Sequence, residues 1–197
     1  MRVVLASKSP RRREILEMLG VKFEIISADA DESSDIRDPE ALVRELALRK
    51  GRATRELLRA RGEWNEDTLI IASDTVVAAA GRILGKPRDH ADATDMLRLL
   101  ANSTHRVISG VALLCGEREV ADFDATAVHF APMTEQEIAW YVQSGEPNDK
   151  AGAYAVQGLA SLWIRGLDGD YFNVVGLPVY RLNTLCKGFL GKALNEI

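Results

Sequence analysis

A dense group of hydrogen-bond donors stands near the start of the chain, in the stretch LASKSPRRREIL. Ser7 and Ser9 flank a lysine, and a proline separates them from three consecutive arginines, Arg11, Arg12 and Arg13. Arginine offers a planar fork of donors and serine a hydroxyl, and both suit the oxygens of a phosphate. A helix is expected to begin here, and its dipole disfavours cations in the first turn. Arginines placed against that preference favour a phosphate site at the helix N-terminus over a solvated basic surface.

A carboxylate interrupts a buried apolar run in LIIASDTVVAAA. Burial of Asp74 is costly unless the side chain is paired or binds a metal. An aspartate that caps the end of a strand is the alternative, but apolar residues resume directly after Thr75. We therefore expect Asp74 to be a catalytic or metal-binding carboxylate.

Lys50 lies on the apolar side of a long helix that is expected to run from Pro39 to about Gly62. In helical geometry it stands about 40° around the axis from Leu46. Two interpretations stay open from this position alone. The side chain could snorkel along the edge of the helix, or it could direct its charge into a site.

A second lysine lies in GRILGKP, which has the look of a nucleotide-binding P-loop. A P-loop needs four residues between its glycines and a serine or threonine after the lysine. Here three residues separate Gly81 from Gly85, and Pro87 follows Lys86, so the segment is not a P-loop. Gly85 and Pro87 still restrict the backbone around Lys86, which could hold this lysine at a site.

An acidic loop, DADESSDIRDP, holds Asp29, Asp31, Glu32, Asp35 and Asp38. Most of these acids are expected at the solvated surface. One or two could bind Mg²⁺, which is usually held by one or two carboxylates together with waters and substrate phosphates. The three histidines of the chain show no ligand spacing, so a zinc site is not expected.

The composition limits the class of protein. The formal net charge is -4 and the isoelectric point is about 5.5, which argues against a nucleic-acid-binding protein. Cys115 and Cys186 lie far apart and form no disulfide framework or zinc pattern. No apolar run approaches the length of a membrane span. We expect a cytoplasmic protein that binds neither nucleic acid nor membranes.

The elements that position these residues follow from the apolar periodicity and the turn residues. Expected strands cover residues 3–6, 23–26, 69–72, 76–80, 107–114, 120–128, 162–167 and 171–174. Expected helices begin after Ser7, at residues 39 and 89, at Thr134 and near Pro178. Strands and helices alternate in the first half and hairpins follow, which predicts a mixed sheet in an α/β domain, with two lobes as one arrangement.

The chain resembles the Maf family of nucleoside triphosphate pyrophosphatases, also called septum-formation proteins. The resemblance rests on SPRR, SDTVV, LGKPRD, DKAGAYAVQG and VVGLP, in that order and nearly end to end. It implies one domain over residues 1–197, with a mixed central sheet, flanking helices and two lobes around a deep cleft. It also implies hydrolysis of a nucleoside triphosphate to the monophosphate and pyrophosphate with Mg²⁺ or Mn²⁺.

The resemblance also assigns residues. Asp74 would be the general base, assisted by Lys86, and Glu32 would hold the metal with Asp74. Thr75 and Gln157 would be specificity positions. The substrate-binding set would comprise Ser7, Ser9, Arg11, Arg12, Lys50, Thr75 and Gln157, with Lys86 also meeting the phosphates.

The stretch AGAYAVQG is similar to the branch acting on dTTP and UTP, and modified pyrimidine nucleotides are further candidate substrates. Gly51 stands where alanine is common, and Ala155 where glycine is common. Three alternatives stay open: a 7-methyl-GTP pyrophosphatase, a house-cleaning enzyme for modified nucleotides only, or a nucleotide-binding regulator of septum formation with incidental hydrolysis. The expected partner is a small nucleotide, and a homodimer stays open.

Overall fold

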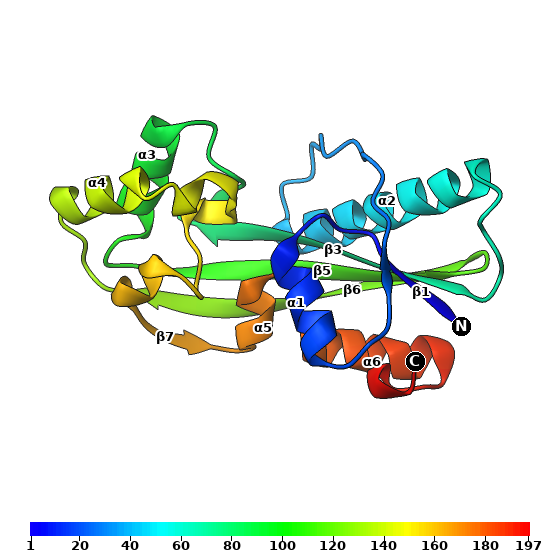
Figure 1. Cartoon of the computed structure of the whole chain (residues 1–197). Helices are drawn as coiled ribbons and strands as arrows, with labels where there is room; N and C mark the ends of the chain where they lie inside the picture. Colours follow the sequence, from blue (N-terminus) through cyan, green and yellow to red (C-terminus); the bar gives the residue numbers. More distant parts are fainter. The chain divides into compact units, whose positions relative to one another are not determined.

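The computed structural model describes all 197 residues as an α/β protein (Figure 1). The strands are β1 (Arg2–Leu5), β2 (Glu24–Ile25), β3 (Thr68–Ala79), β4 (Arg82–Leu84), β5 (Thr104–Cys115), β6 (Arg118–Phe130) and β7 (Ile164–Asp168). The helices are α1 (Pro10–Met18), α2 (Pro39–Ala60), α3 (His90–Leu100), α4 (Glu135–Gln143), α5 (Tyr171–Val175) and α6 (Val179–Leu190). Short 3₁₀ turns lie at Glu146–Asp149, Ala151–Ala153, Leu159–Trp163 and Leu194–Glu196.

The strands form one mixed sheet, which confirms the expected fold class. Its order is β2-β1-β3-β5-β6-β7, and β4 pairs with β3. Strand β1 runs parallel to β2 and β3, whereas the β3–β4 and β6–β7 pairs are antiparallel. None of the helices combines the length and the apolar character of a membrane span.

The chain divides into two compact units. Unit 1 comprises Met1–Asp74, Ser109–Asp124 and Gly176–Ile197, and unit 2 comprises Thr75–Ile108 and Ala125–Val175. The single domain over residues 1–197 and the deep cleft stay predictions.

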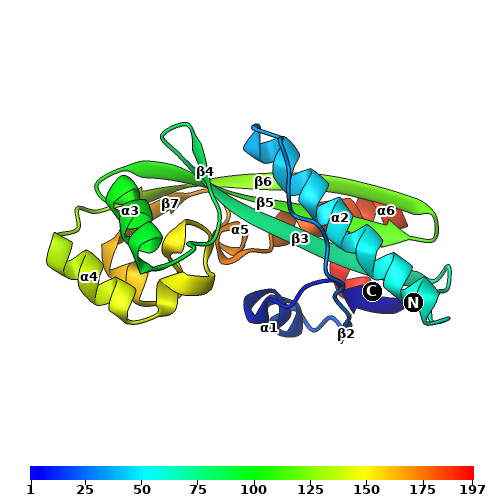
Figure 2. The same ribbon diagram turned by 90° about the horizontal axis from the view of Figure 1, so that it is seen from above.

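In unit 1, helix α2 covers one face of the sheet and α6 the other (Figures 1 and 2). Helix α2 comes unusually close to β5. A Cβ on Gly110 would lie 2.2 Å from the Val43 carbonyl oxygen, and one on Gly51 would lie 2.3 Å from Leu114 Cδ1. Glycine is therefore required at Gly110, where the neighbour is backbone, whereas at Gly51 the end of the Leu114 side chain would have to shift to admit a Cβ.

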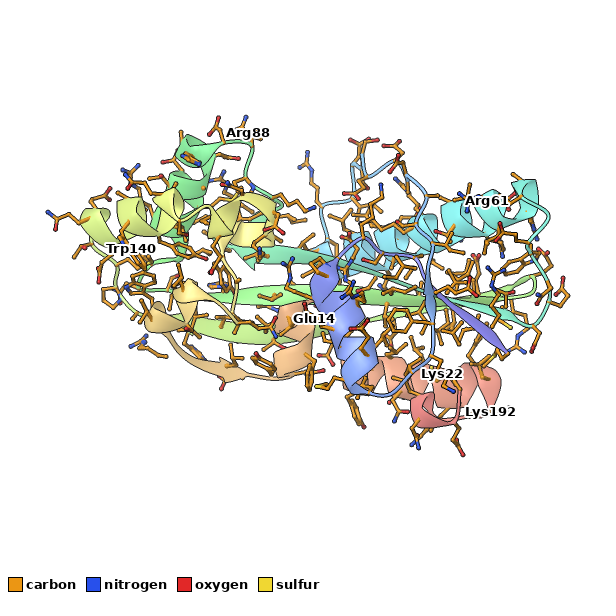
Figure 3. All side chains as sticks on the ribbon, viewed as in Figure 1. Glu14, Lys22, Arg61, Arg88, Trp140 and Lys192 are labelled. Carbon is orange, nitrogen blue, oxygen red and sulfur yellow. The ribbon has the colours of Figure 1, made fainter.

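In unit 2, helices α3 and α4 bury their apolar faces in one core. Leu97 of α3 and Tyr141 of α4 are fully buried there, beside Phe130 of β6. Helix α4 begins after Thr134, as expected, with a capping box in which Thr134 and Glu137 exchange side-chain and backbone hydrogen bonds. Trp140 stays half exposed on the outer side of α4 (Figure 3).

Two expectations about the strands were wrong. The apolar run around Asp74 is one uninterrupted strand, β3, and not two strands with a break. Residues 171–174, expected as a strand, belong to helix α5. Asp170 starts this helix by accepting a hydrogen bond from the Phe172 amide at 2.8 Å, and buried Asn173 donates to the Val107 carbonyl at 2.9 Å.

Candidate active site

The helix α1 begins at the serine-rich turn after β1, as expected. Ser9 is its N-cap residue but makes no capping hydrogen bond with its side chain, and the first turn contains no acid. The Ser7 hydroxyl instead accepts a hydrogen bond from the Ser9 amide at 3.2 Å. The helix therefore begins with basic side chains and hydroxyls, a composition that suits an anion.

Arg12 is fixed in position by groups distant in sequence. Its Nε donates to the Gly176 carbonyl at 2.7 Å, and its Nη1 to the Ser7 hydroxyl at 3.2 Å. Buried Ser73 donates to the same Gly176 carbonyl at 3.1 Å. Gly176 has a φ of 125°, which favours glycine, so this carbonyl position depends on the residue type.

Asp74 lies buried in the middle of β3, and a cation of α2 reaches it. Lys50 Nζ is 2.5 Å from Asp74 Oδ1 and 2.9 Å from Glu32 Oε1. The lysine side chain is 19% exposed and the aspartate side chain 10%, so this pair is largely withdrawn from water. The Lys50 ammonium therefore meets two carboxylates and does not extend into solvent, and its role in a substrate site stays a prediction.

The charges of this group influence one another. Burial lowers the pKa of Arg12, while the negative charges of Asp74 and Glu32 oppose that shift and neighbouring Arg11 adds to it. Unit 1 thus brings Ser7, Arg12, Glu32, Lys50 and Asp74 into one electrostatic cluster.

The chemistry of this donor set fits a hard divalent cation. Glu32 and Asp74 present carboxylates to the same ammonium group, and Mg²⁺ binds through one or two carboxylates, with substrate phosphates and waters completing its shell. No group of three or more acidic, histidine or cysteine side chains forms an all-protein metal site. The arrangement therefore suits a cation that arrives with a phosphate ligand.

The remaining candidates, Thr75, Lys86 and Gln157, lie in unit 2. Lys86 and Gln157 are exposed, and Thr75 is half-buried. A hydrogen bond holds the backbone next to Lys86: the Gly85 carbonyl accepts from the Gly152 amide at 3.0 Å. This bond supports the expectation that the backbone around Lys86 is restrained.

The histidines take no part in this cluster. His105 is buried, its Nε2 lies 2.8 Å from the Tyr154 hydroxyl, and burial lowers its pKa to about 4. His129 contacts Thr104 and Asp168, and His90 is exposed. Each histidine is therefore either part of a local hydrogen-bond pair or exposed.

Several supporting residues were missed by the sequence analysis. The Gly176 carbonyl accepts hydrogen bonds from Arg12 and from Ser73, and Glu146 accepts three hydrogen bonds. Ser73 could have been recognised from the sequence, because it is a second polar residue beside Asp74 in an otherwise apolar run. Nothing in the sequence pattern pointed to Glu146, because its partners are 5 to 14 residues away, in α4 and in the 3₁₀ turn Leu159–Trp163.

Comparison with known proteins identifies the family. A family model described as Maf-like protein matches residues 2–189, so the chain belongs to the Maf family. Two similar proteins carry the name dTTP/UTP pyrophosphatase. One, from Symbiobacterium thermophilum, is 44% identical over 180 residues, which cover 91% of this chain and 89% of that protein. The other, from Bacillus cereus, is 43% identical over 189 residues and 95% of both chains.

Among solved structures, the Ham1 protein of Staphylococcus aureus overlaps with part of the chain. The TM-score is 0.47 at 14% sequence identity, and the overlap covers 66% of this chain and 72% of that one.

Proposed function

We propose that this protein hydrolyses dTTP and UTP to the nucleoside monophosphate and pyrophosphate. The observation that carries the proposal is the cluster of Arg12 of α1, Lys50 of α2 and Asp74 of β3, where fixed cations stand beside a buried carboxylate. The relatives named dTTP/UTP pyrophosphatase support the choice of substrate, since they match this chain over nearly its whole length.

In the proposed reaction, a water attacks the α-phosphorus and the bond between this phosphorus and the bridging oxygen to the β-phosphorus breaks. Asp74 accepts the proton of the water, and pyrophosphate leaves with the electron pair of the broken bond. Ser7, Ser9, Arg11, Arg12, Lys50 and Lys86 would bind the phosphate oxygens. Cations fixed before the reaction stabilise the developing negative charge without a cost of reorganisation.

We further propose that Glu32 and Asp74 hold Mg²⁺ or Mn²⁺ together with the substrate. When bound, the metal polarises the phosphoryl group and neutralises its charge. Lys50, which contacts both carboxylates, orients them toward the same point.

Thr75 and Gln157 are the proposed specificity residues. A glutamine amide presents an acceptor and a donor side by side, and it can pair with the N3–H and a carbonyl of uracil or thymine. Cytosine reverses this pattern, so discrimination requires that the amide be held in one orientation.

A panel of nucleotides tests the function. Purified protein is incubated with dTTP, UTP, CTP, the purine triphosphates, 7-methyl-GTP and modified pyrimidine triphosphates, and phosphate is measured after addition of a pyrophosphatase. We expect the highest kcat/KM for dTTP and UTP, with phosphate release only in the presence of the added enzyme. Release without it would show cleavage at another bond. Turnover confined to 7-methyl-GTP or to modified nucleotides would replace the proposed substrate, and tight binding without turnover would favour a regulator.

The cytoplasmic location, the homodimer and the absence of nucleic-acid and membrane partners stay predictions. A nucleotide is the partner that the proposed reaction requires.

A further inference from the structure

Two side chains, Tyr141 and Glu146, form hydrogen bonds with the two ends of the segment that carries Gln157. Tyr141 is a buried residue in the last turn of α4, and Glu146 begins the 3₁₀ turn that follows this helix. Neither residue belongs to the proposed catalytic or phosphate-binding set. Both lie in unit 2 with the segment that they contact.

Glu146 acts at the C-terminal end of this segment. One carboxylate oxygen accepts a hydrogen bond from the Leu159 amide at 3.0 Å, and the other accepts from the Ala160 amide at 3.4 Å. These amides open the 3₁₀ turn Leu159–Trp163, whose own N-cap residue, Gly158, provides no side chain. A remote carboxylate thus satisfies donors that the start of a helical turn leaves unpaired.

Tyr141 acts at the N-terminal end. Its hydroxyl accepts a hydrogen bond from the Ala155 amide at 3.3 Å and donates to Glu146 at 2.8 Å. The ring is completely buried and lies 5.8 Å from the ring of Trp163, edge to face. The hydroxyl therefore contacts the N-terminal end of the segment directly and its C-terminal end through Glu146, while the ring is held in the core.

Gly158 permits the close approach on which this arrangement depends. A Cβ at this position would lie 2.2 Å from a Glu146 carboxylate oxygen. Ala155, in contrast, has no positive φ, so alanine fits where glycine is common in the family.

We propose that Tyr141 and Glu146 are positioning residues that hold the Gln157 segment and thereby set the choice between uracil or thymine and cytosine. This inference rests on the proposed function. Gln157 is exposed and lies between the two fastened ends, so its backbone position depends on the hydrogen bonds at Ala155, Leu159 and Ala160. Small displacements of a recognition group greatly weaken its interactions, and the effect is strongest for paired donors and acceptors.

The test compares Tyr141→Phe, Glu146→Gln and Gln157→Glu with the unmodified protein. The measured quantity is the ratio of kcat/KM for UTP to that for CTP. Tyr141→Phe keeps the buried ring and removes the hydroxyl, and Glu146→Gln keeps the size and replaces one acceptor by a donor. We expect each to lower the ratio about 2- to 10-fold, as the loss of single hydrogen bonds suggests, and Gln157→Glu to lower it at least as much.

A matched control is Glu135→Gln, which makes the same chemical change on α4 at a residue that pairs with Arg98 instead of the segment. It should leave the ratio unchanged. Hydrogen exchange gives a second readout: the amides of Leu159 and Ala160 should exchange faster in Glu146→Gln than in the control. Tyr141→Phe decides the question if Glu146→Gln does not fold.

The outcomes separate the inference from the function on which it rests. If Gln157→Glu lowers the ratio but Tyr141→Phe and Glu146→Gln leave it unchanged, the positioning role is wrong and the function stands. If both variants lose activity equally on UTP and CTP, their role is structural and the inference is overturned. If the unmodified protein releases no pyrophosphate from UTP, the proposed function itself fails and the inference falls with it.

Discussion

Lys50 Nζ lies 2.5 Å from Asp74 Oδ1, and this contact joins the long helix α2 to the middle of strand β3 across 24 positions of sequence. The contact explains why each of the two charged residues is tolerated at its position. A buried carboxylate is costly without a partner, and a lysine on the apolar side of a helix needs an acceptor. Glu32 contacts the same ammonium group, so Lys50 links helix α2 to the acidic loop and to strand β3.

The first prediction concerns Asp74. The variant Asp74→Asn should lower kcat for UTP about 10²- to 10⁴-fold, the usual contribution of a general base, because an amide cannot accept the proton of water. Nucleotide binding, measured by calorimetry, should persist. The control is Asp67→Asn, directly before the same strand, where the carboxylate pairs with the N-terminal amine. Turnover near normal in Asp74→Asn would exclude the role as base.

The second prediction concerns Lys50. The variant Lys50→Met removes the charge and leaves the carboxylates of Asp74 and Glu32 facing each other, so kcat/KM for UTP should fall about 100-fold or more, the scale on which preorganised donors contribute. Arg52→Met is the matched control, since Arg52 is on the same helix but pairs with Glu119. Melting curves must accompany the kinetics. A large loss of stability with unchanged kcat/KM would indicate that the pair serves only the fold.

The third prediction concerns the metal. A chelator should abolish hydrolysis, and added Mg²⁺ or Mn²⁺ should restore it. The variant Glu32→Gln should raise the Mn²⁺ concentration needed for half-maximal activity, whereas Asp29→Asn, in the same loop but paired with Lys8, should not. Titration of Mn²⁺ in the presence of a non-hydrolysable nucleotide measures the same difference without turnover. Undiminished activity in excess chelator would remove the metal from the mechanism.

The fourth prediction concerns pH and stability. Burial lowers the pKa of His105 to about 4, so the folded state binds its proton less readily than the unfolded state does. The contribution to stability is therefore complete at pH values above the unfolded pKa of about 6.5 and is lost as the pH falls toward 4. Between pH 7.5 and pH 5 this loss amounts to about 2 kcal/mol.

The variant His105→Gln isolates this contribution, because an amide can still hydrogen-bond the Tyr154 hydroxyl but does not titrate. Its free energy of unfolding in urea should fall less between pH 7.5 and pH 5 than that of the unmodified protein. His90→Gln, at an exposed position, should behave as the unmodified protein does. Equal pH dependence in all three would show that His105 carries no such linkage.

The residues with strong local signals could be predicted from the sequence. Asp74 disturbs an apolar run, and the arginines at 11 and 12 oppose the helix dipole, so composition and position alone single them out. The cap of α4 and the extent of α2 follow equally from local patterns. The family resemblance supplied the roles that these patterns leave open.

What the sequence could not predict depends on tertiary contacts. Tyr171 to Val174 has the composition of a strand but forms a helix, since buried Asn173 finds its partners at Val107 and Thr126. Glu146 lies among turn residues, and its importance appears only when the amides of Leu159 and Ala160 come within reach. Such tertiary contacts do not produce a periodic pattern of residue types in the sequence.

The hydrogen bond between Arg12 and the Gly176 carbonyl has a consequence for the timing of synthesis. The two groups are separated by 164 positions, so the arginine is made long before its acceptor exists. At roughly 5–20 residues per second, this interval is on the order of ten to thirty seconds. Helix α1 can form early in that time, but a growing chain lacks this anchor until Gly176 has been translated. The position of the Arg12 side chain is thus set late in synthesis, although the residue itself is among the first to be made.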